Sequence, residues 1–258
     1  FIPNFYGTTE KDDFLIIEFI DGMSLLDIKK LKLNENDKIT IIFQLLSVFQ
    51  YLHEQHFIYR DLKPNNVMIN KNKTIVLIDF DRMIKFNNEE QTLDLNEYFV
   101  APEIVEGNMR EYGDIYSIGQ IIYYIFQEKK PNKNILINSN ELKNNKEIQA
   151  IYDKCTKKKP DERPSCSELI NDFYIYVLNR DITLKNILSE DQFQISLLLL
   201  KHYNIKRAIE YLTFAADQNH IYSQYALGKI YYEGQFIKED ISKAIYYFEL
   251  ASNQNHIN

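Results

Sequence analysis

Two stretches near the end of the chain repeat each other, and this repeat limits the fold more than any other feature. Residues 205–221 (IKRAIEYLTFAADQNHI) and residues 241–257 (ISKAIYYFELASNQNHI) match at an offset of 36 residues, from 205 to 241. A period of this size is typical of paired helices that bury their apolar faces only by stacking on the next pair. Two unrelated amphipathic helices can share apolar positions by chance, but amphipathicity does not require the shared Asn-His-Ile at the turn. We therefore expect an α-solenoid of helix-turn-helix repeats here.

The stretch LGKIYYEGQFIKED, residues 227–240, has the features of a connection between two such helices. Gly228 allows two helices to approach closely, Gly234 ends the first helix, and Asp240 caps the second. The pattern resembles the Sel-one-like repeat, a relative of the tetratricopeptide repeat, although Phe236 stands where that family usually has Gly. The earlier copy lacks the signature in its first helix. The resemblance implies a surface that recruits a protein partner.

The first part of the chain has a different pattern. Residues 34–57 start with Asn and Asp and continue with apolar residues at helical spacing, which predicts a long, mostly buried helix. Residues 112–127 predict a second buried helix, and residues 14–20 (FLIIEFI) predict a buried strand. Two short β-rich pieces, NVMI and TIVLI, flank the polar turn NKNK and predict a hairpin.

A polar loop between the long helix and the hairpin, YRDLKPNN, carries residues suited to phosphoryl transfer. Transfer to a hydroxyl needs a carboxylate that orients and deprotonates the acceptor, a cation near the phosphate, and oxygen ligands for Mg²⁺. Asp61, Lys63 and Asn66 offer these three groups on one loop. Asp79 offers a second metal ligand at the end of the next strand. An unrelated polar turn could hold these residues by chance, but the motifs downstream keep the same register.

This loop resembles the catalytic loop of protein kinases, H-R-D-x-x-x-x-N, followed by their metal-binding loop. The resemblance covers residues 1–178 and implies a kinase C-lobe with remnant hinge strands. It implies that Asp61 is the catalytic base, that Lys63 steadies the γ-phosphate of ATP, and that Asn66 and Asp79 hold Mg²⁺. The form D-L-K-P-x-N is similar to that of serine/threonine kinases rather than tyrosine kinases.

Further motifs of the same family carry structural expectations. Tyr59 stands in place of the first His of the catalytic loop and is expected to pack with Phe80 in an internal spine. Asp114, at the start of a buried helix, is expected to cap the backbone of the catalytic loop. Arg163 is expected to pair with Glu103 of the Ala-Pro-Glu motif.

Residues before the loop resemble the hinge that binds adenine in this family. The resemblance implies that Glu18 offers a backbone carbonyl, that Ile20 offers a backbone N–H, and that Ile17 is the gatekeeper. Met68 would form part of the apolar floor under the base. This strand is a weak signal alone, because any buried strand has the same pattern.

The resemblance also suggests a regulatory contact. Arg60 precedes Asp61, and in the family such an Arg often waits for a phosphate on the activation segment. We hypothesise that phosphorylated Thr92 is that partner. The alternative is that Glu89, Glu90 or Asp94 serves as a built-in anion, and the sequence does not decide between the two.

The chain departs from the family pattern in several places. Asp81 stands where the family has Gly, and we expect it to stiffen the metal-binding loop while Mg²⁺ binding is retained. Asn96 stands where the family has Thr. The sequence shows no Gly-rich loop, strand Lys or partner Glu of the family, so we expect these parts upstream of Phe1 and expect this stretch alone to be inactive.

Composition excludes several other classes of protein. A net charge of −7 argues against a protein that coats nucleic acid or binds a membrane surface. The two cysteines, Cys155 and Cys166, are too few for a disulfide framework and lack the spacing of metal ligands. No apolar run is long enough to span a bilayer. These features predict a reducing, cytoplasmic setting.

Together the patterns predict a mainly α chain with three parts: a kinase domain at 1–178, a linker at 179–190 and helical repeats at 191–258. The leading hypothesis is a serine/threonine kinase that uses ATP and Mg²⁺ to phosphorylate a protein substrate, with a repeat tail that binds a protein partner. The alternative is a catalytically inactive pseudokinase scaffold that acts through its repeats. A pure helical-repeat adaptor would not explain the first 178 residues.

Overall fold

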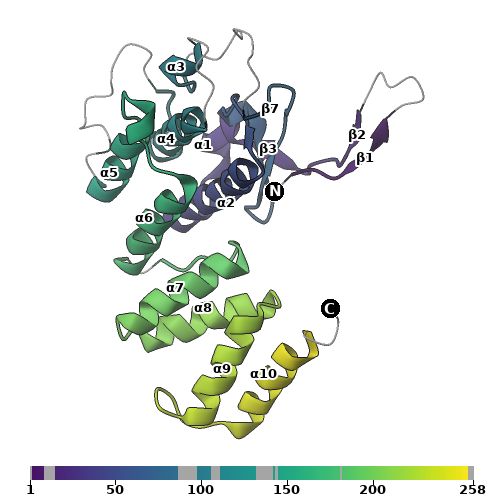
Figure 1. The fold of residues 1–258 in the computed structure, drawn as a ribbon, viewed down its shortest axis with the longest axis vertical. Coiled ribbons are helices and arrows are strands. Elements are labelled where there is room, and N and C mark those ends of the chain that lie inside the picture. The colour runs from purple at the N-terminus through teal and green to yellow at the C-terminus, as the bar shows by residue number, and fades with distance from the viewer. Residues whose placement is uncertain are drawn as a thin grey trace. The chain divides into compact units, whose positions relative to one another are not determined.

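The chain folds into two compact units, Phe1–Asp172 and Phe173–Asn258. Helices dominate both units and the strands are few and short (Figure 1). This confirms the expected mainly α fold with a helical repeat tail. The structure is a computed structural model, and it describes residues 2–8, 15–86, 98–105, 111–131, 142, 145–180 and 182–254.

Two buried helices form the centre of the first unit. Helix α2 (Glu35–Glu54) begins with a capping box, in which Asn34 and Asp37 each accept a hydrogen bond from the backbone N–H of the other. Helix α4 (Tyr112–Gln127) packs against α2. Both helices bury residues on nearly every side, as helices in the interior of a domain do. Their positions match the two long helices expected from the sequence.

A three-stranded antiparallel sheet brings together the two loops expected to be catalytic (residues 59–66) and metal-binding (residues 78–82), and we call them the catalytic loop and the metal-binding loop after that expectation. Strand β5 (Val67–Asn70) lies between β3 (Gly22–Ser24) and β6 (Ile75–Leu77), and β5 and β6 form the expected hairpin. Because these two strands are antiparallel, the residue before β5 faces the residue after β6. The N–H of Ile78 donates to the carbonyl of Asn66 at 2.9 Å. Polar side chains that flank the hairpin therefore lie next to each other.

The strand expected at residues 14–20 differs from the prediction. Strand β2 (Leu15–Ile17) is shorter and pairs only with β1 (Phe5–Thr8), in a separate two-stranded sheet. Ile16 and Ile17 are 47% and 48% exposed. The prediction of a buried strand is therefore wrong, because two strands alone cannot cover their own side chains.

The rest of the first unit consists of short elements. Helix α5 packs on α4, where a side chain at Gly119 would place its Cβ only 2.7 Å from the Cβ of Cys155. Cys155 and Cys166 are both buried and free. Helix α6 begins in the first unit and ends in the second. The short elements of the first unit, with α6 extending into the second, are α1 (Ile28–Leu31), β4 (Phe57–Ile58), β7 (Ile84–Lys85), α3 (Pro102–Val105), α5 (Lys146–Cys155) and α6 (Cys166–Leu178).

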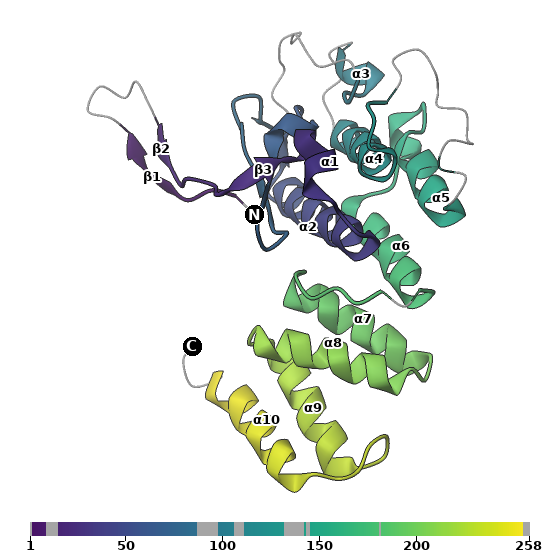
Figure 2. The same cartoon turned by 180° about the vertical axis from the view of Figure 1, so that it is seen from behind.

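The second unit contains four further helices in a row, each packed against the next (Figure 2). They form two helix-turn-helix repeats, α7–α8 and α9–α10. The 36-residue sequence offset places α8 on α10, so the repeat expected from the sequence has a structural counterpart. The helices are α7 (Ser189–Lys201), α8 (Ile205–Asp217), α9 (Ile221–Glu233) and α10 (Ile241–Gln254).

The turn between α8 and α9 explains why Asn-His-Ile recurs in the sequence. Asn219 has a φ of 63°, in the left-handed region that Asn adopts more easily than most residues. His220 caps α9, because its Nδ1 accepts from the N–H of Ser223 at 3.2 Å. The second copy of this turn includes residues 255–257, which lie outside the described residues.

The connection between α9 and α10 follows the sequence expectation. Gly234 ends α9 with a φ of 62°, and Asp240 accepts from the N–H of Lys243 at the start of α10. A Cβ at Gly228 would lie 2.6 Å from the ring of Phe248. The close approach of α9 and α10 therefore requires Gly at this position.

In each repeat a buried glutamine of the first helix, Gln192 or Gln224, bonds to a glutamine at the end of the second helix, and sequence reasoning missed these bonds. The Nε2 of Gln218 donates to Oε1 of Gln192, and the Nε2 of Gln254 donates to Oε1 of Gln224, both at 2.8 Å. These matched bonds place α7 on α9 at an offset of 32, from 192 to 224. Ser196 then stands where the later copy has Gly228, so the first helix of the earlier copy also has a small residue there.

Candidate active site

Three polar side chains of the catalytic loop are joined by hydrogen bonds. Oδ2 of Asp61 accepts from the Nζ of Lys63 at 2.6 Å and from the Nδ2 of Asn66 at 3.1 Å. The same Nδ2 also donates to the carbonyl of Asp61. Asp61 is 1% exposed and its Oδ1 has no hydrogen-bond partner. The loop thus holds a buried carboxylate whose Oδ1 makes no hydrogen bond to another described residue.

Asp114, in the first turn of α4, fixes the backbone of this loop. Its two carboxylate oxygens accept from the N–H groups of Tyr59 and Arg60, each at 2.9 Å. His53 of α2 contacts the same carboxylate at 3.0 Å. Charge-assisted bonds to backbone N–H groups are strong in a buried setting. The structure therefore contains the capping contact expected of Asp114, and it adds His53, which the sequence pattern did not single out.

Edge-to-face aromatic contacts anchor Tyr59 of the catalytic loop. The ring of Tyr59 meets the ring of Phe80 edge to face, with centroids 5.6 Å apart, and Phe49 of α2 extends the stack. The hydroxyl of Tyr59 donates to the carbonyl of Ile78. Burial raises the pKa of Tyr59 well above its usual value, so the residue stays neutral. Tyr59 and Phe80 lie together as the sequence suggested.

The metal-binding loop takes a tight turn at Asp79 rather than at Asp81. Asp79 has a φ of 67°, whereas Asp81 is not among the described residues with positive φ. The Gly of the family pattern is therefore not needed for the backbone here. A hydrogen bond between the Asp79 and Asp81 side chains raises the pKa of Asp79, with burial and the charge of Asp61 adding to the effect. The two carboxyl groups thus lie within reach of a shared proton. Asn96, another departure from the family pattern, lies outside the described residues.

Arg82 follows this pair and contacts the catalytic loop, which the sequence pattern did not indicate. Its Nη1 lies 3.7 Å from Oδ1 of Asp61, the oxygen without a hydrogen-bond partner. Its backbone carbonyl accepts from the Nε of Arg60. The sequence shows only that Arg82 follows Asp81, and this position does not predict which residue its long side chain contacts.

Arg60 is buried, with 5% of its surface exposed. The partner expected for it, phosphorylated Thr92, lies outside the described residues. The alternative partners Glu89, Glu90 and Asp94 also lie outside them. The choice between the two hypotheses for Arg60 therefore stays a prediction.

The pair expected between Arg163 and Glu103 is present in the structure. The guanidinium donates from both Nη1 and Nη2 to the two carboxylate oxygens of Glu103, and Nη1 also donates to the carbonyl of Tyr112. The guanidinium of Arg163 lies over the ring of Tyr116, 5.0 Å from its centroid. Arg163 therefore joins the short helix α3, through Glu103, to the start of α4, through the carbonyl of Tyr112.

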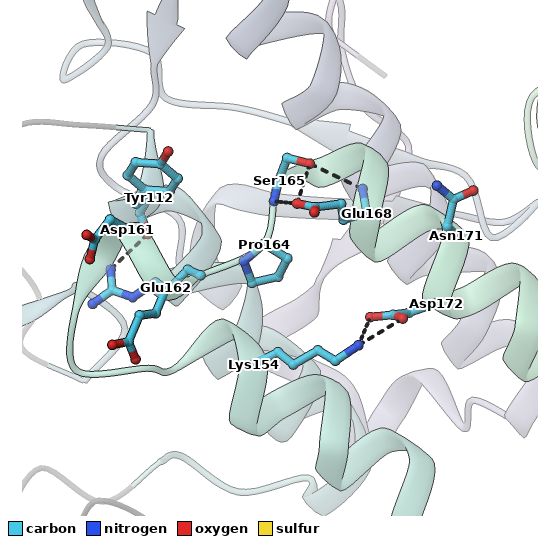
Figure 3. A pocket seen from close by; sticks show the side chains of 10 residues that line it. Tyr112, Lys154, Asp161, Glu162, Pro164, Ser165, Glu168, Asn171 and Asp172 are labelled. Atoms are coloured by element: carbon cyan, nitrogen blue, oxygen red, sulfur yellow. Dashed lines mark hydrogen bonds and ion pairs between the residues drawn. The ribbon is translucent and has the colours of Figure 1, made fainter.

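A polar pocket lies beside Arg163 and away from the catalytic loop (Figure 3). The Nζ of Lys154 on α5 pairs with the carboxylate of Asp172 on α6 at 2.7 Å. Ser165 and Glu168 form a capping box at the start of α6, and the bonds from Ser165 hold the pKa of Glu168 below its usual value. The ion pair joins α5 to α6 and the capping box starts α6, so both have structural roles.

The residues expected to form an adenine-binding hinge lie in and after β2, where several side chains are exposed. The N–H of Glu18 donates to the carbonyl of Asn4 at 2.8 Å, and the side chain of Asn4 donates to the Glu18 carboxylate. Ile17, expected as the gatekeeper, is 48% exposed, and Ile20 is half-buried. Met68 lies on the partly exposed face of β5. Within the described part of the chain, the hydrogen bonds of Glu18 thus go to Asn4 and not to the catalytic loop.

The catalytic loop and the metal-binding loop fit Mg²⁺ held by oxygen ligands. Asn66 directs its amide hydrogens to Asp61, which leaves its carbonyl oxygen for a cation. Asp79 is exposed at the end of the hairpin. An amide oxygen and a carboxylate are ligands that Mg²⁺ prefers. In the described residues no group of three or more His, Cys, Asp or Glu forms a metal site of its own.

None of the described helices has the length and apolar character that a membrane crossing requires.

Comparison with known proteins gives two matches along the chain. Residues 1–193 match the protein kinase domain, and residues 198–220 and 221–256 match the Sel1 repeat. A probable serine/threonine-protein kinase of Dictyostelium discoideum is 30% identical over 66% of this chain and 45% of its own length. A probable serine/threonine-protein kinase KIN1 homolog of Enterocytozoon bieneusi is 35% identical over 54% of this chain and 25% of its own length. The chain thus spans less than half the length of these relatives.

Proposed function

This chain belongs to the protein kinase family, with Sel1 repeats after the kinase domain, and on that premise we propose that it phosphorylates serine or threonine in a protein substrate. The observation that carries the proposal is the hydrogen-bonded set of Asp61, Lys63 and Asn66. Oδ1 of Asp61 accepts the proton of the acceptor hydroxyl and orients that hydroxyl for attack. The two relatives described above are named probable serine/threonine-protein kinases, which favours these acceptors over tyrosine.

The same residues define how the nucleotide would be held. When bound, ATP supplies the phosphoryl group, and Mg²⁺ neutralises charge that develops on it. Asn66 and Asp79 would hold Mg²⁺, and the ammonium of Lys63 would lie near the γ-phosphate. Ile17, Glu18, Ile20 and Met68 remain our proposed contacts to the adenine base.

The repeats give the protein a second role in this proposal. Stacked helical repeats offer extended surfaces, and we propose that this tail binds a protein partner or the substrate itself. The proposed setting is the cytoplasm, where the two free cysteines would stay reduced.

The test is phosphate transfer from labelled ATP by the full-length protein. We expect Asp61→Asn to reduce transfer about a hundredfold or more, because it removes the base. Asp79→Asn should abolish transfer through loss of the metal ligand. Equal phosphate transfer by the wild type and both variants would exclude the proposed kinase activity.

A pseudokinase scaffold is the second candidate function, and two contacts favour it. The guanidinium of Arg82 lies 3.7 Å from the buried Oδ1 of Asp61, and Asp81 lies beside Asp79. The kinase reaction uses Asp61 and Asp79 but needs neither Arg82 nor Asp81, which lie beside them. Wild-type protein that binds a fluorescent ATP analogue but transfers no phosphate would support this candidate.

A further inference from the structure

Arg82 lies beside the carboxylate that we propose as the catalytic base. Its Nη1 is 3.7 Å from Oδ1 of Asp61, and that oxygen is buried. An acceptor hydroxyl must come within about 2.8 Å of Oδ1 to give up its proton. Because Oδ1 is buried, the hydroxyl reaches it only when a neighbouring group moves aside. The guanidinium of Arg82 is such a neighbouring group.

The side chain of Arg82 can move while its backbone stays in place. Its carbonyl accepts a hydrogen bond from the Nε of Arg60, and the N–H of Met83 donates to the carbonyl of Phe80 at 3.1 Å. These bonds fix the backbone on both sides of the turn. The side chain is 28% exposed, and long side chains that reach water change rotamer quickly.

The contact between Arg82 and Asp61 is weak for a guanidinium. At 3.7 Å it is longer than a hydrogen bond, and it involves one carboxylate oxygen. Arg163 in the same unit shows the stronger arrangement, because it donates from Nη1 and Nη2 to both carboxylate oxygens of Glu103. Arg prefers this bidentate geometry with carboxylates and phosphates. An anion that offers two oxygens therefore competes well for Arg82.

Asp61 does not depend on Arg82 for its position. Its Oδ2 accepts from the Nζ of Lys63 at 2.6 Å and from the Nδ2 of Asn66 at 3.1 Å. Both bonds remain when the guanidinium leaves Oδ1. Departure of Arg82 would thus open one oxygen of the base and leave the other held as before.

We propose that Arg82 selects protein substrates that carry an anion close to the acceptor Ser or Thr. The carboxylate or phosphate of the substrate pairs with the guanidinium of Arg82, which leaves Asp61, and the acceptor hydroxyl takes its place at Oδ1. This inference rests on the proposed phosphorylation of Ser or Thr, and it adds the class of substrate. Arg82 acts here as a specificity residue and not as a catalytic one.

The distances limit where the anion lies in the substrate. An acceptor oxygen about 2.8 Å from Oδ1 lies within roughly 6.5 Å of the Nη1 of Arg82. An extended peptide advances about 3.3 Å per residue. The anion is therefore expected on one of the two residues on either side of the acceptor.

Asp81 offers the opposite kind of recognition at the same place. It is exposed and directly precedes Arg82, so a Lys or Arg of a substrate can pair with it instead. Substrates with acidic and with basic neighbours of the acceptor thus give opposite results. The test has to compare both.

The test uses Ser peptides that differ only at the two residues on either side of the acceptor, which are Asp, phosphoserine, Gln or Lys. The full-length protein transfers phosphate to each from labelled ATP. We expect kcat/KM for the Asp and phosphoserine peptides to exceed that for the Gln peptide about tenfold, with the Lys peptide poorest. A gain for only one of the two acidic peptides would support the proposal and identify the anion as carboxylate or phosphate.

Three variants separate recognition by Arg82 from other effects. Arg82→Ala should make the Asp and Gln peptides about equal, mainly because the Gln peptide improves once the cation beside Oδ1 is gone. Arg82→Glu should reverse the order and favour the Lys peptide. Lys85→Ala removes another cation from the same segment and should keep the tenfold preference of the wild type.

Three results would overturn the proposal. The first is equal phosphate transfer by the wild type to the Asp, phosphoserine and Gln peptides. The second is a preference for the acidic peptides that Arg82→Ala retains in full. The third is a preference of the wild type for the Lys peptide, which would assign recognition to Asp81.

A binding assay distinguishes failure of this inference from failure of the proposed kinase activity. Fluorescent peptides in which Ala replaces the acceptor Ser need no ATP, and their Kd values by anisotropy should follow the same order. Protein that transfers no phosphate but binds the acidic peptides through Arg82 would count against the activity and support the inference. Phosphate transfer without any order among the peptides would do the reverse.

Discussion

Both units of this protein bury neutral polar side chains, but they differ in how many charged side chains they bury. Among the described residues, the first unit buries four charged side chains, whereas the second buries one, Asp191, which accepts a hydrogen bond from Tyr174. The other buried polar side chains of the second unit are neutral amides and hydroxyls. The charged set is Arg60, Asp61, Asp114 and Arg163, and the neutral set is Gln192, Ser196, Ser223 and Gln224.

This difference follows from what each unit has to hold in place. Burying a charge costs far more than burying an amide, so buried charges persist where backbone N–H groups or a reacting group must be fixed. Stacked repeats need only directional bonds between helices, which neutral amides supply. The first unit should therefore be sensitive to the loss of one charge, and the second to the loss of close packing.

The largest expected effect comes from Asp114→Asn in the first unit. An amide keeps one acceptor oxygen but places its NH2 group against the N–H donor of either Tyr59 or Arg60, so we expect a loss of about 3–5 kcal/mol in the free energy of unfolding. Hydrogen exchange by mass spectrometry should show faster exchange in the first unit alone. Asp21→Asn, which alters only an exposed ion pair, should change stability by less than about 0.5 kcal/mol. An unaltered exchange pattern in Asp114→Asn would contradict the comparison.

Next in size is Gly228→Ala in the second unit. The added Cβ would lie 2.6 Å from the Phe248 ring, so α9 and α10 must separate, at a cost of about 1–3 kcal/mol. Urea denaturation followed by hydrogen exchange in α9 and α10 measures this. The neighbouring Lys229→Ala, on the exposed side, is the control. A stabilised Gly228→Ala protein would show that packing does not limit this unit.

A smaller effect, on rate rather than stability, is expected for Arg82→Ala. The substitution removes a cation 3.7 Å from Oδ1 of Asp61, so the acceptor hydroxyl meets less competition. We expect kcat/KM of the full-length protein to rise up to about fivefold, equivalent to about 1 kcal/mol. Lys85→Ala, in the same segment, should leave it unchanged. A fall in kcat/KM would mean that Arg82 supports the reaction.

The smallest expected effect is on how the stability of the second unit depends on pH. Hydrogen bonds from Gln194, and then His220, hold the pKa of Glu190 below its usual value. A depressed pKa adds stability that is present above the unfolded pKa and is lost as the pH falls through the folded one. Because Glu190 is largely exposed, the change should be a few tenths of a kcal/mol at about pH 3–5. Urea melts of Glu190→Gln should show a flatter dependence on pH there, and an equal slope would argue against this pair.

Elements with strong periodicity were predictable from the sequence. The two buried helices, the hairpin and the repeat offset all follow from apolar spacing and turn residues. The residues of the catalytic loop were also predictable, because their spacing along one short loop leaves little freedom. Asp114 and the pair of Arg163 with Glu103 were expected only through the family resemblance.

Contacts that depend on the path of a side chain were not predictable. Nothing in the sequence shows that Arg82 reaches Asp61 or that Gln192 and Gln224 join the repeats. Burial was mispredicted at Ile16, Ile17 and Phe19, because an apolar strand pattern does not say whether a second layer covers the strand. At Asp81, the family pattern suggested a backbone constraint that the structure places at Asp79 instead.

The two buried cysteines make the opening of the first unit measurable by thiol modification. Burial raises the pKa of both thiols, so Cys155 and Cys166 should react with a thiol reagent only when the structure around them opens. Residues 173–258 contain no cysteine, so labelling is blind to the repeats. The rate of thiol modification in the native protein therefore reports how often the kinase unit opens, with no added label and no signal from its tail.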